Sequence, residues 1–297
     1  MYSVSVIYDF TIVLSQAAHA FMFSPEMSTS LGVTRIMLAI CVILNSLQLR
    51  KVADIYLGSA STAIGLENYR PPTLGHLLWK NFDSCNIRGL MNLEIICAIC
   101  MMLGFYPQFF AIVIYLIVYS YHSHNPYITN GGHAQLRTMI LLLSLSPCGT
   151  ALSLDCLIHN KPILGTMIEP WSIRIMQIFI ALVYYKSATN KLVTSYDWWN
   201  GKMLSYALNG TNFSRVSARV PKWLCVLGCY YTLIAQNLFI YLVWFKETRY
   251  YVLTMLVLLH TAMIFTMLLG YFPIIAISCL SIFIDPDDLH NILSKLL

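Results

Sequence analysis

The sequence contains few charged side chains, and this scarcity excludes most classes of soluble protein. Only 10% of its 297 residues are Asp, Glu, Lys or Arg, whereas 58% are hydrophobic and the mean hydropathy is +0.67. A soluble domain usually carries about 25% charged residues, because its surface must face water. Most of this surface must therefore face lipid, which predicts a multi-pass protein of the cell membrane.

Several familiar chemical motifs are also missing. The sequence contains no zinc-protease helix, no phosphate-binding loop, no dinucleotide-binding glycine pattern and no nucleophile elbow. His122 and His124 resemble a metal pair only superficially, because side chains two residues apart on a helix point in different directions. No patch of interleaved basic and aromatic residues suits nucleic acid. We therefore expect neither a metal nor a nucleic-acid partner.

The nine cysteines lie mostly within apolar runs, where a free cysteine behaves as a small apolar side chain. Cys97 and Cys100 have the spacing of a redox or metal motif, but they fall inside an expected helix and no second pair accompanies them. We interpret them as core residues. Cys148 and Cys156 flank the end of one apolar run, and the sequence leaves open whether they form a disulfide.

Long apolar runs predict an all-α, polytopic transmembrane bundle. A spanning helix needs roughly 20 mostly apolar residues, and about eight such runs can be placed. The first residues, up to Pro25, predict an interfacial helix ahead of the bundle. The expected units are an interfacial helix at 1–29, a transmembrane domain at 30–285 and a tail at 286–297. The predicted spans are 32–49, 89–104, 106–121, 136–152, 172–190, 223–245, 251–269 and 271–284.

This arrangement places two polar segments, 130–133 and 190–192, at the same face of the bundle. Ionisable groups at membrane depth are costly, so they usually face the bundle interior or a water-filled cavity. Burial disfavours the charged form of a lysine, which would let Lys191 act as a base beside His133 and Arg137. The alternative is that Lys191 extends to the lipid headgroups and His133 is a polar residue at a helix start.

Other polar residues in apolar runs need partners. His260 lies in the middle of a predicted span, where a hydrogen bond between helices is favoured over a ligand role. Pairing among Arg35, Glu94 and Arg174 is one expectation, because buried charges persist mainly when paired, although the sequence does not assign the partners.

An ordered set of short motifs resembles the HTTM domain, the transmembrane part of vitamin K-dependent gamma-carboxylases and of bacterial relatives. The resemblance runs from about residue 30 to 284. It rests on Arg35, GGH at 131–133, SPCG at 146–149, SLD at 153–155, WSIRIMQ at 171–177, YYKSATNKL at 184–192, WNG at 199–201, His260 and GYFP at 270–273.

The resemblance implies a chemistry for the polar segments. In the carboxylases, the lysine that matches Lys191 deprotonates a reduced quinone, and the histidine that matches His133 assists at the substrate. The implied co-substrate is vitamin K hydroquinone or menaquinol. Asn130, Arg137, Tyr184, Tyr185 and His260 are expected to line the cavity. The resemblance also implies that the face carrying Lys191 and His133 is extracytoplasmic. The positive-inside rule implies the opposite, because the loops on that face, 50–88, 122–135 and 191–222, are the more basic ones and would be cytoplasmic.

Two departures affect which function is expected. Gln236 and Asn237 stand where many members carry a glutamate, so no acid role is expected there. A stand-alone domain of this size is more similar to SdpB-type proteins, the bacterial members needed to produce a secreted peptide toxin. The expected partners are membrane lipid, a small secreted peptide and a small accessory protein. The alternatives are a gamma-glutamyl carboxylase-like enzyme and a non-catalytic scaffold, transporter or immunity-like partner.

Overall fold

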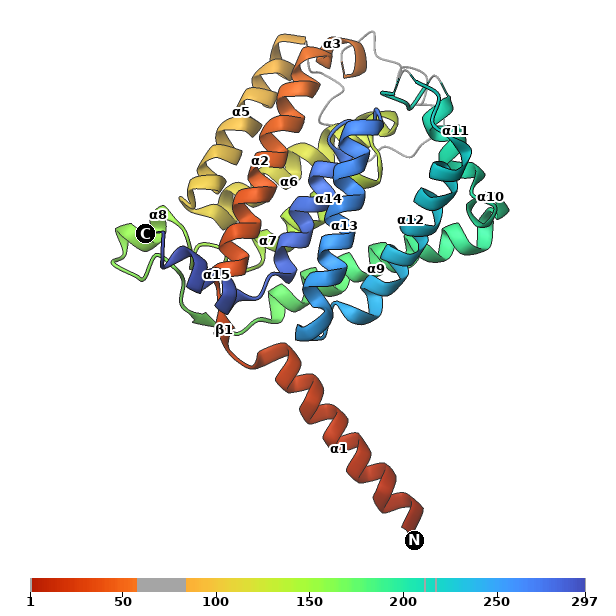
Figure 1. Cartoon of the computed structure of the whole chain (residues 1–297). Helices are drawn as coiled ribbons and strands as arrows, with labels where there is room; N and C mark the ends of the chain where they lie inside the picture. Colours follow the sequence, from red (N-terminus) through yellow and green to blue (C-terminus); the bar gives the residue numbers. More distant parts are fainter. Residues whose placement is uncertain (1, 58–83, 211, 217, 297) are drawn as a thin grey trace.

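The computed structural model describes residues 2–57, 84–210, 212–216 and 218–296, and these residues form the predicted all-α bundle (Figure 1). The loop expected at 50–88 lies mostly outside the described residues. Eight helices build the bundle: α2 (Thr29–Lys51), α5 (Ser84–Leu103), α6 (Pro107–His124), α7 (Gly131–Ser144), α9 (Trp171–Thr194), α12 (Lys222–Leu242), α13 (Lys246–Thr266) and α14 (Phe272–Leu280).

Shorter elements connect these helices. The sequence did not indicate the two-stranded antiparallel sheet, in which β1 (Glu26–Met27) pairs with β2 (Met167–Ile168). A pair of two-residue strands is too short to produce an alternating pattern. The remaining connectors are α3 (Ala53–Tyr56), η2 (Pro126–Ile128), α8 (Leu154–Ile158), α10 (Tyr196–Trp199), α11 (Lys202–Asn209), η3 (Ser281–Phe283) and α15 (Pro286–Leu293).

A helix overlaps every predicted span, although α7 ends at Ser144, well before the end of the predicted span 136–152. The helices differ in how well they suit a membrane. Four are long and apolar enough to cross a bilayer, namely α2, α5 from Asn86, α12 and α13. Helix α9 has 24 residues but carries Arg174, Lys186 and Lys191, whereas α7 has only 14 residues. Among the described residues, length and composition therefore support four spans, and the larger predicted number stays a prediction.

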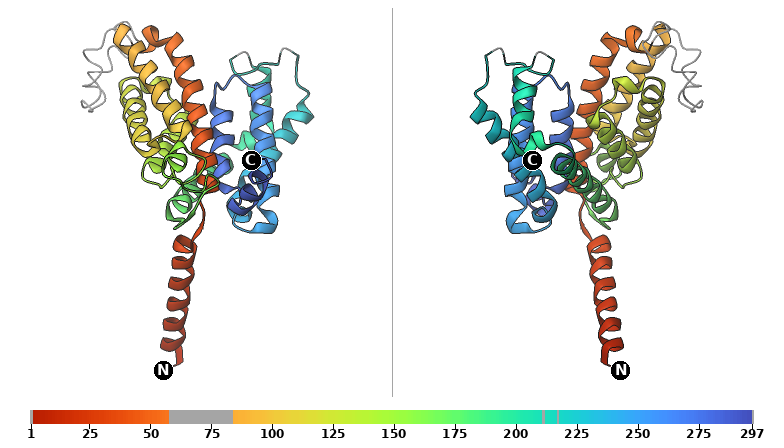
Figure 2. Two further views of the ribbon diagram at one scale, coloured as in Figure 1. Left: turned by 90° about the vertical axis from the view of Figure 1, so that its left-hand side faces the viewer. Right: turned by 90° about the vertical axis from the view of Figure 1, so that its right-hand side faces the viewer.

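The bundle has two halves joined by α14. Figure 2 shows α2, α5, α6 and α7 on one side and α11, α12 and α13 on the other. Helix α14 packs on α2, α7 and α13, so it lies between the halves. Helix α1 (Tyr2–Phe23) projects from the bundle as a separate rod (Figures 1 and 2). It contacts α9, where the Arg174 guanidinium lies 5.0 Å from the centre of the Phe21 ring.

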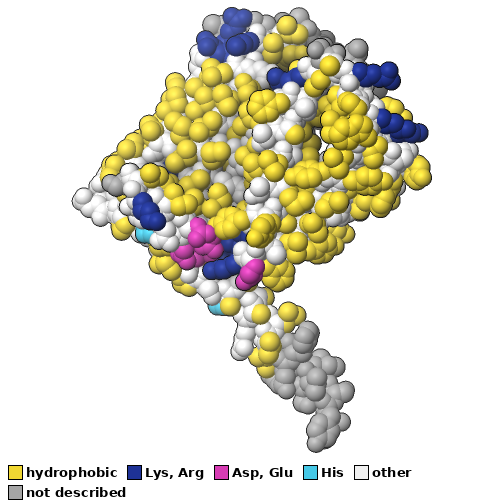
Figure 3. Space-filling model, in the orientation of Figure 1, with side chains coloured by type: hydrophobic (Ala, Val, Ile, Leu, Met, Phe, Trp, Pro, Cys, Tyr) yellow, Lys and Arg dark blue, Asp and Glu magenta, His cyan; other side chains and the backbone are white. Residues whose placement is uncertain are grey.

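The surface has the character expected of a membrane protein. Figure 3 shows apolar side chains over most of the face drawn, with Lys and Arg at the upper and lower ends of the bundle. Ile96 on α5, Leu227 on α12 and Phe265 on α13 are each more than half exposed. Large exposed apolar areas mark contact surfaces, and here they cover helices long enough to span a bilayer. The chain is therefore a multi-pass membrane protein.

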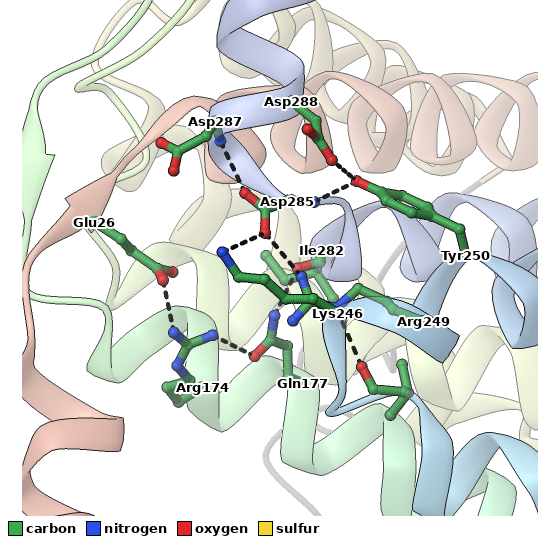
Figure 4. Close-up of polar contacts among 11 residues, drawn as sticks. Glu26, Arg174, Gln177, Lys246, Arg249, Tyr250, Ile282, Asp285, Asp287 and Asp288 are labelled. Atoms are coloured by element: carbon green, nitrogen blue, oxygen red, sulfur yellow. Dashed lines mark hydrogen bonds and ion pairs between the residues drawn. The ribbon is translucent and has the colours of Figure 1, made fainter.

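A cluster of charges at the lower end of the bundle joins both ends of the chain to it (Figure 4). Arg174 on α9 forms an ion pair with Glu26 at 2.6 Å, and Arg249 on α13 pairs with Asp285 at 3.1 Å. Burial raises the pKa of Glu26, and the adjacent Arg174 guanidinium opposes this shift. Tyr250 donates a hydrogen bond to Asp288 on α15. These contacts hold β1 and α15 against the bundle.

Arg35 is completely buried, and its partners are backbone carbonyl groups rather than an acid. Its Nη1 atom donates to the carbonyls of Cys148 and Ala151, and its Nη2 atom donates to the carbonyl of Leu152. Arg35 therefore fastens α2 to the loop that follows α7. Cys148 and Cys156, whose pairing the sequence left open, are both buried free thiols.

Gly104, at the turn between α5 and α6, should tolerate no side chain. Its φ is +72°, and an added Cβ would lie 2.3 Å from the Cβ of Ser153 and 3.0 Å from the Arg35 guanidinium carbon. Gly104→Ala is expected to destabilise the protein by about 3 kcal/mol, because it combines an unfavourable φ with overpacking.

Thermal unfolding in detergent measures this effect, and Gly89 on α5 provides the control. An added Cβ at Gly89 meets nothing within 4 Å. Gly89→Ala should therefore leave the melting temperature unchanged or raise it, because alanine favours a helix. Equal melting temperatures for the two variants would contradict the packing described around Gly104.

Candidate functional site

Lys191 lies in the last turn of α9, where its amine is held by neutral groups. Its Nζ atom donates to Ser187 Oγ at 2.5 Å, to Gln236 Oε1 at 3.0 Å and to the carbonyl of Ser187 at 3.3 Å. The same atom lies 5.3 Å from the centre of the Trp198 ring. Gln236 comes from the middle of α12, so two helices position this amine.

The environment of Lys191 differs from that of an ordinary surface lysine. Its side chain is half-buried, whereas Lys186 on the same helix is exposed. No acid pairs with Lys191 in the described part of the chain. An amine surrounded by neutral acceptors can lose its proton without leaving a buried carboxylate unpaired. This geometry suits a base.

Tyr184 and His260 lie between Lys191 and the region around His133. The Tyr184 hydroxyl and His260 Nε2 are 2.9 Å apart, which joins α9 to α13. His260 Nδ1 is buried without a partner among the described residues. The His260 ring lies 5.8 Å from that of Phe272, which in turn lies against Gly132 at the start of α7.

His133 begins α7 as part of a capping box. The Asn130 side chain accepts a hydrogen bond from the His133 backbone N–H, and His133 Nδ1 accepts one from the Asn130 backbone N–H, each at 3.1 Å. His133 Nε2 lies 2.8 Å from Asn45 Oδ1 on α2. Because Nδ1 accepts a hydrogen bond, Nε2 carries the proton and donates it to Asn45.

A chain of hydrogen bonds continues from His133 into the core. Asn45 Nδ2 donates to the Tyr121 hydroxyl, and that hydroxyl donates to Glu94 Oε1, each at 3.4 Å. Glu94 is completely buried, and its Oε2 atom has no partner among the described residues. The sequence identified Glu94 as a costly charge, but nothing in it indicated Asn45 or Tyr121. Arg35, Glu94 and Arg174 do not pair with one another: Arg35 binds backbone carbonyls, Glu94 accepts from Tyr121 and Arg174 pairs with Glu26.

A cavity of about 280 Å³ opens beside His133. It lies between α2, α6, the start of α7 and the turn before α14. Lys191 is not among its lining residues, so the described cavity does not bring Lys191 and His133 together. Its lining residues are Asn45, Gln48, Leu49, Val52, Tyr56, Tyr121, His122, Tyr127, Ile128, Asn130, His133, Leu269, Gly270 and Tyr271.

Lys191 and His133 contact their neighbouring helices at different distances from the helix ends. The start of α12, the end of α13 and the start of α7 lie at one end, because Arg215 pairs with Thr266 and Gly132 lies against Phe272. Gln236 follows Lys222 by 14 residues, about 21 Å along α12. His133 meets Asn45 six residues before the end of α2, about 9 Å from that end.

Arg137 and Tyr185, which were also predicted to line the cavity, lie outside it. Arg137 on α7 lies over the Tyr119 ring at 5.8 Å. Tyr185 is exposed and lines an apolar groove of about 280 Å³ between α9 and α12. The groove is also lined by Ile178, Ala181, Leu182, Ile240 and Trp244. In the described residues no group of three or more His, Cys, Asp or Glu could hold a metal ion.

The comparison with known families decides the membership of this chain. Residues 23–287 match the HTTM domain, which covers most of the sequence. The chain belongs to the HTTM domain family. No curated protein and no solved structure matches it. The matched range of this HTTM protein includes α2, all of α5 to α14 and both polar regions around Lys191 and His133.

Proposed function

We propose that this HTTM protein is of the SdpB type and acts on, or helps to mature, a small exported peptide. In this proposal Lys191 is the base and a membrane quinol is the co-substrate. This role is more specific than membership of the HTTM domain family, and it is inferred from the site around Lys191. The supporting observation is a half-buried amine that Ser187 and Gln236 hold, with no acid paired to it in the part of the chain that the structure describes.

The apolar groove between α9 and α12 fits the proposed quinol. Its wall at Leu182 and Tyr185 is exposed on the outer surface of the bundle, so a lipid-soluble ring can enter sideways from the bilayer. Ile240 in the groove lies one helical turn beyond Gln236, the residue that holds Lys191. Reduced quinones supply electrons and a weakly acidic hydroxyl when bound. The groove residues would hold the ring against α12, and Lys191, six residues beyond Tyr185 on α9, would be the group that accepts its proton.

Peptide mass spectrometry in producing cells tests this proposal. We expect a small secreted peptide of these cells to disappear, or to appear with an altered mass, when the gene is deleted, and the wild-type gene should restore it. An unchanged amount and mass after deletion would contradict the proposal. A gain equal to one carbon dioxide on a glutamate of the restored peptide would instead identify the carboxylase-like activity.

A further inference from the structure

We infer that the cavity at His133 binds a neutral, hydrogen-bonding side chain, and that His122 rather than His133 offers it a ring nitrogen. The inference deepens the proposed function, since it rests on an exported peptide as the source of that side chain. Four features of the described cavity support it. Both ring nitrogens of His133 are hydrogen-bonded, His122 has an unpartnered ring nitrogen, no described lining residue is Lys or Arg, and the lining combines amide groups with apolar side chains.

Both ring nitrogens of His133 are already used by the protein. Nδ1 accepts the Asn130 backbone N–H in the capping box, and Nε2 donates to Asn45. An imidazole has only these two hydrogen-bonding atoms. His133 therefore has none left for a ligand unless the start of α7 or the contact with α2 is broken.

His122 is the neighbouring ring that remains available. Its centre lies 5.6 Å from that of His133, and its side chain lines the same cavity although the residue is only 5% exposed. Its Nδ1 atom is buried and has no hydrogen-bond partner among the described residues. A buried polar atom without a partner is costly, and a ligand that hydrogen-bonds to this ring would remove part of that cost.

The described lining of the cavity contains no group suited to an anion. Among the residues that the structure describes, no Lys or Arg lines it, and Arg137 is held over the Tyr119 ring. The start of α7 could attract an anion, but its capping box already uses the N–H groups of Asn130 and His133. The hydrogen bonds from Asn45 through Tyr121 lead to a buried acid, Glu94. A carboxylate ligand would therefore lose its hydration without gaining a positive partner.

The remaining walls suit a short side chain with an uncharged polar end. Gln48 and Asn130 offer amide groups, whereas Leu49, Val52 and Leu269 offer apolar surface. Small ligand sites typically combine an apolar lining with a few polar groups that fix the orientation of the ligand. At about 280 Å³ the cavity holds roughly one side chain with its adjoining backbone.

Two probes of the same shape test the charge preference: N-acetylglutamine amide and N-acetylglutamate amide. The full chain in lipid nanodiscs is treated with diethyl pyrocarbonate, which modifies unprotonated and accessible histidine nitrogens, and the modified residues are identified by mass spectrometry. Exposed His159 serves as the internal reference. We expect His122 to react faster than His133, and the glutamine probe to slow the reaction at His122 at least tenfold more than the glutamate probe.

A second measurement uses the ring of His122 itself. His122→Phe keeps the ring but removes its nitrogens, and it should weaken binding of the glutamine probe about tenfold, as a lost hydrogen bond implies. His159→Phe should leave binding unchanged. Faster modification of His133, stronger protection by the glutamate probe, no protection by either probe, or undiminished binding by a folded His122→Phe variant would each overturn the inference.

This test is independent of the activity assigned to Lys191. It measures labelling and binding in a cavity that Lys191 does not line, so failure here leaves the peptide-maturation proposal standing. Conversely, normal peptide production without the gene would remove the proposed function but leave the binding preference of the cavity measurable.

Discussion

Arg35→Ala is expected to lower the free energy of unfolding by about 3 to 5 kcal/mol, which approaches the whole stability of many domains. The side chain is 0% exposed and donates to three backbone carbonyls in the loop after α7. Truncation leaves those carbonyls without donors in a buried region. Each unsatisfied buried group costs about 1 to 3 kcal/mol, and a cavity adds to this.

Thermal unfolding of the purified protein in detergent measures the Arg35 effect. Arg50 on the same helix is the matched control, because its side chain is exposed near the end of α2. Arg50→Ala should leave the melting temperature nearly unchanged. Arg35→Lys should also be destabilising, since an ammonium cannot reproduce the planar fork that reaches several carbonyls. An Arg35→Ala variant that unfolds like the Arg50→Ala variant would contradict the contacts assigned to the buried guanidinium.

Lys191→Ala is expected to lower the yield of mature peptide about 100-fold or more, the usual size of a general-base contribution. The physical reason is the loss of a half-buried amine, because burial disfavours the charged form of a lysine and lets it accept a proton. Quantitative mass spectrometry of the secreted peptide measures the effect. Lys186→Ala, at the exposed position on the same helix, should yield as much peptide as the wild type.

The Lys191→Arg variant distinguishes a role of Lys191 as a base from a role as a positive charge. Arginine keeps the charge, but it does not lose its proton in proteins. The account therefore predicts that this variant is as inactive as Lys191→Ala while both proteins remain folded. Full peptide production by Lys191→Arg would mean that the site needs a cation rather than a base, and full production by Lys191→Ala would remove the catalytic role altogether.

The helices could be predicted because their signal is local. Runs such as 32–49 and 223–245 are apolar along their length, and helices α2 and α12 coincide with them. No local sequence pattern indicates how these helices are arranged relative to one another. Placing Lys191 and His133 at one face assumes that the helices run side by side, whereas α9 is strongly tilted relative to α2 (Figure 1).

The costly polar residues could also be found from the sequence, but their partners could not. Arg35 and Glu94 are conspicuous because each interrupts an apolar run. Arg35 binds backbone carbonyls, which every residue possesses, and Glu94 accepts from one tyrosine among 19. The position of His122 is a similar case, because the cavity that it lines is built by several elements that are separate in the sequence.

The most direct test of the role of Lys191 follows quinol consumption by the purified chain in nanodiscs. Menaquinol and the peptide are supplied together in air, and ultraviolet absorbance reports the loss of quinol. We predict that the wild type and Lys186→Arg consume quinol at equal rates, and that Lys191→Arg is slower by about 100-fold. Equal rates for all three proteins, or no consumption above the protein-free background by the wild type, would contradict the proposal that this amine is the base.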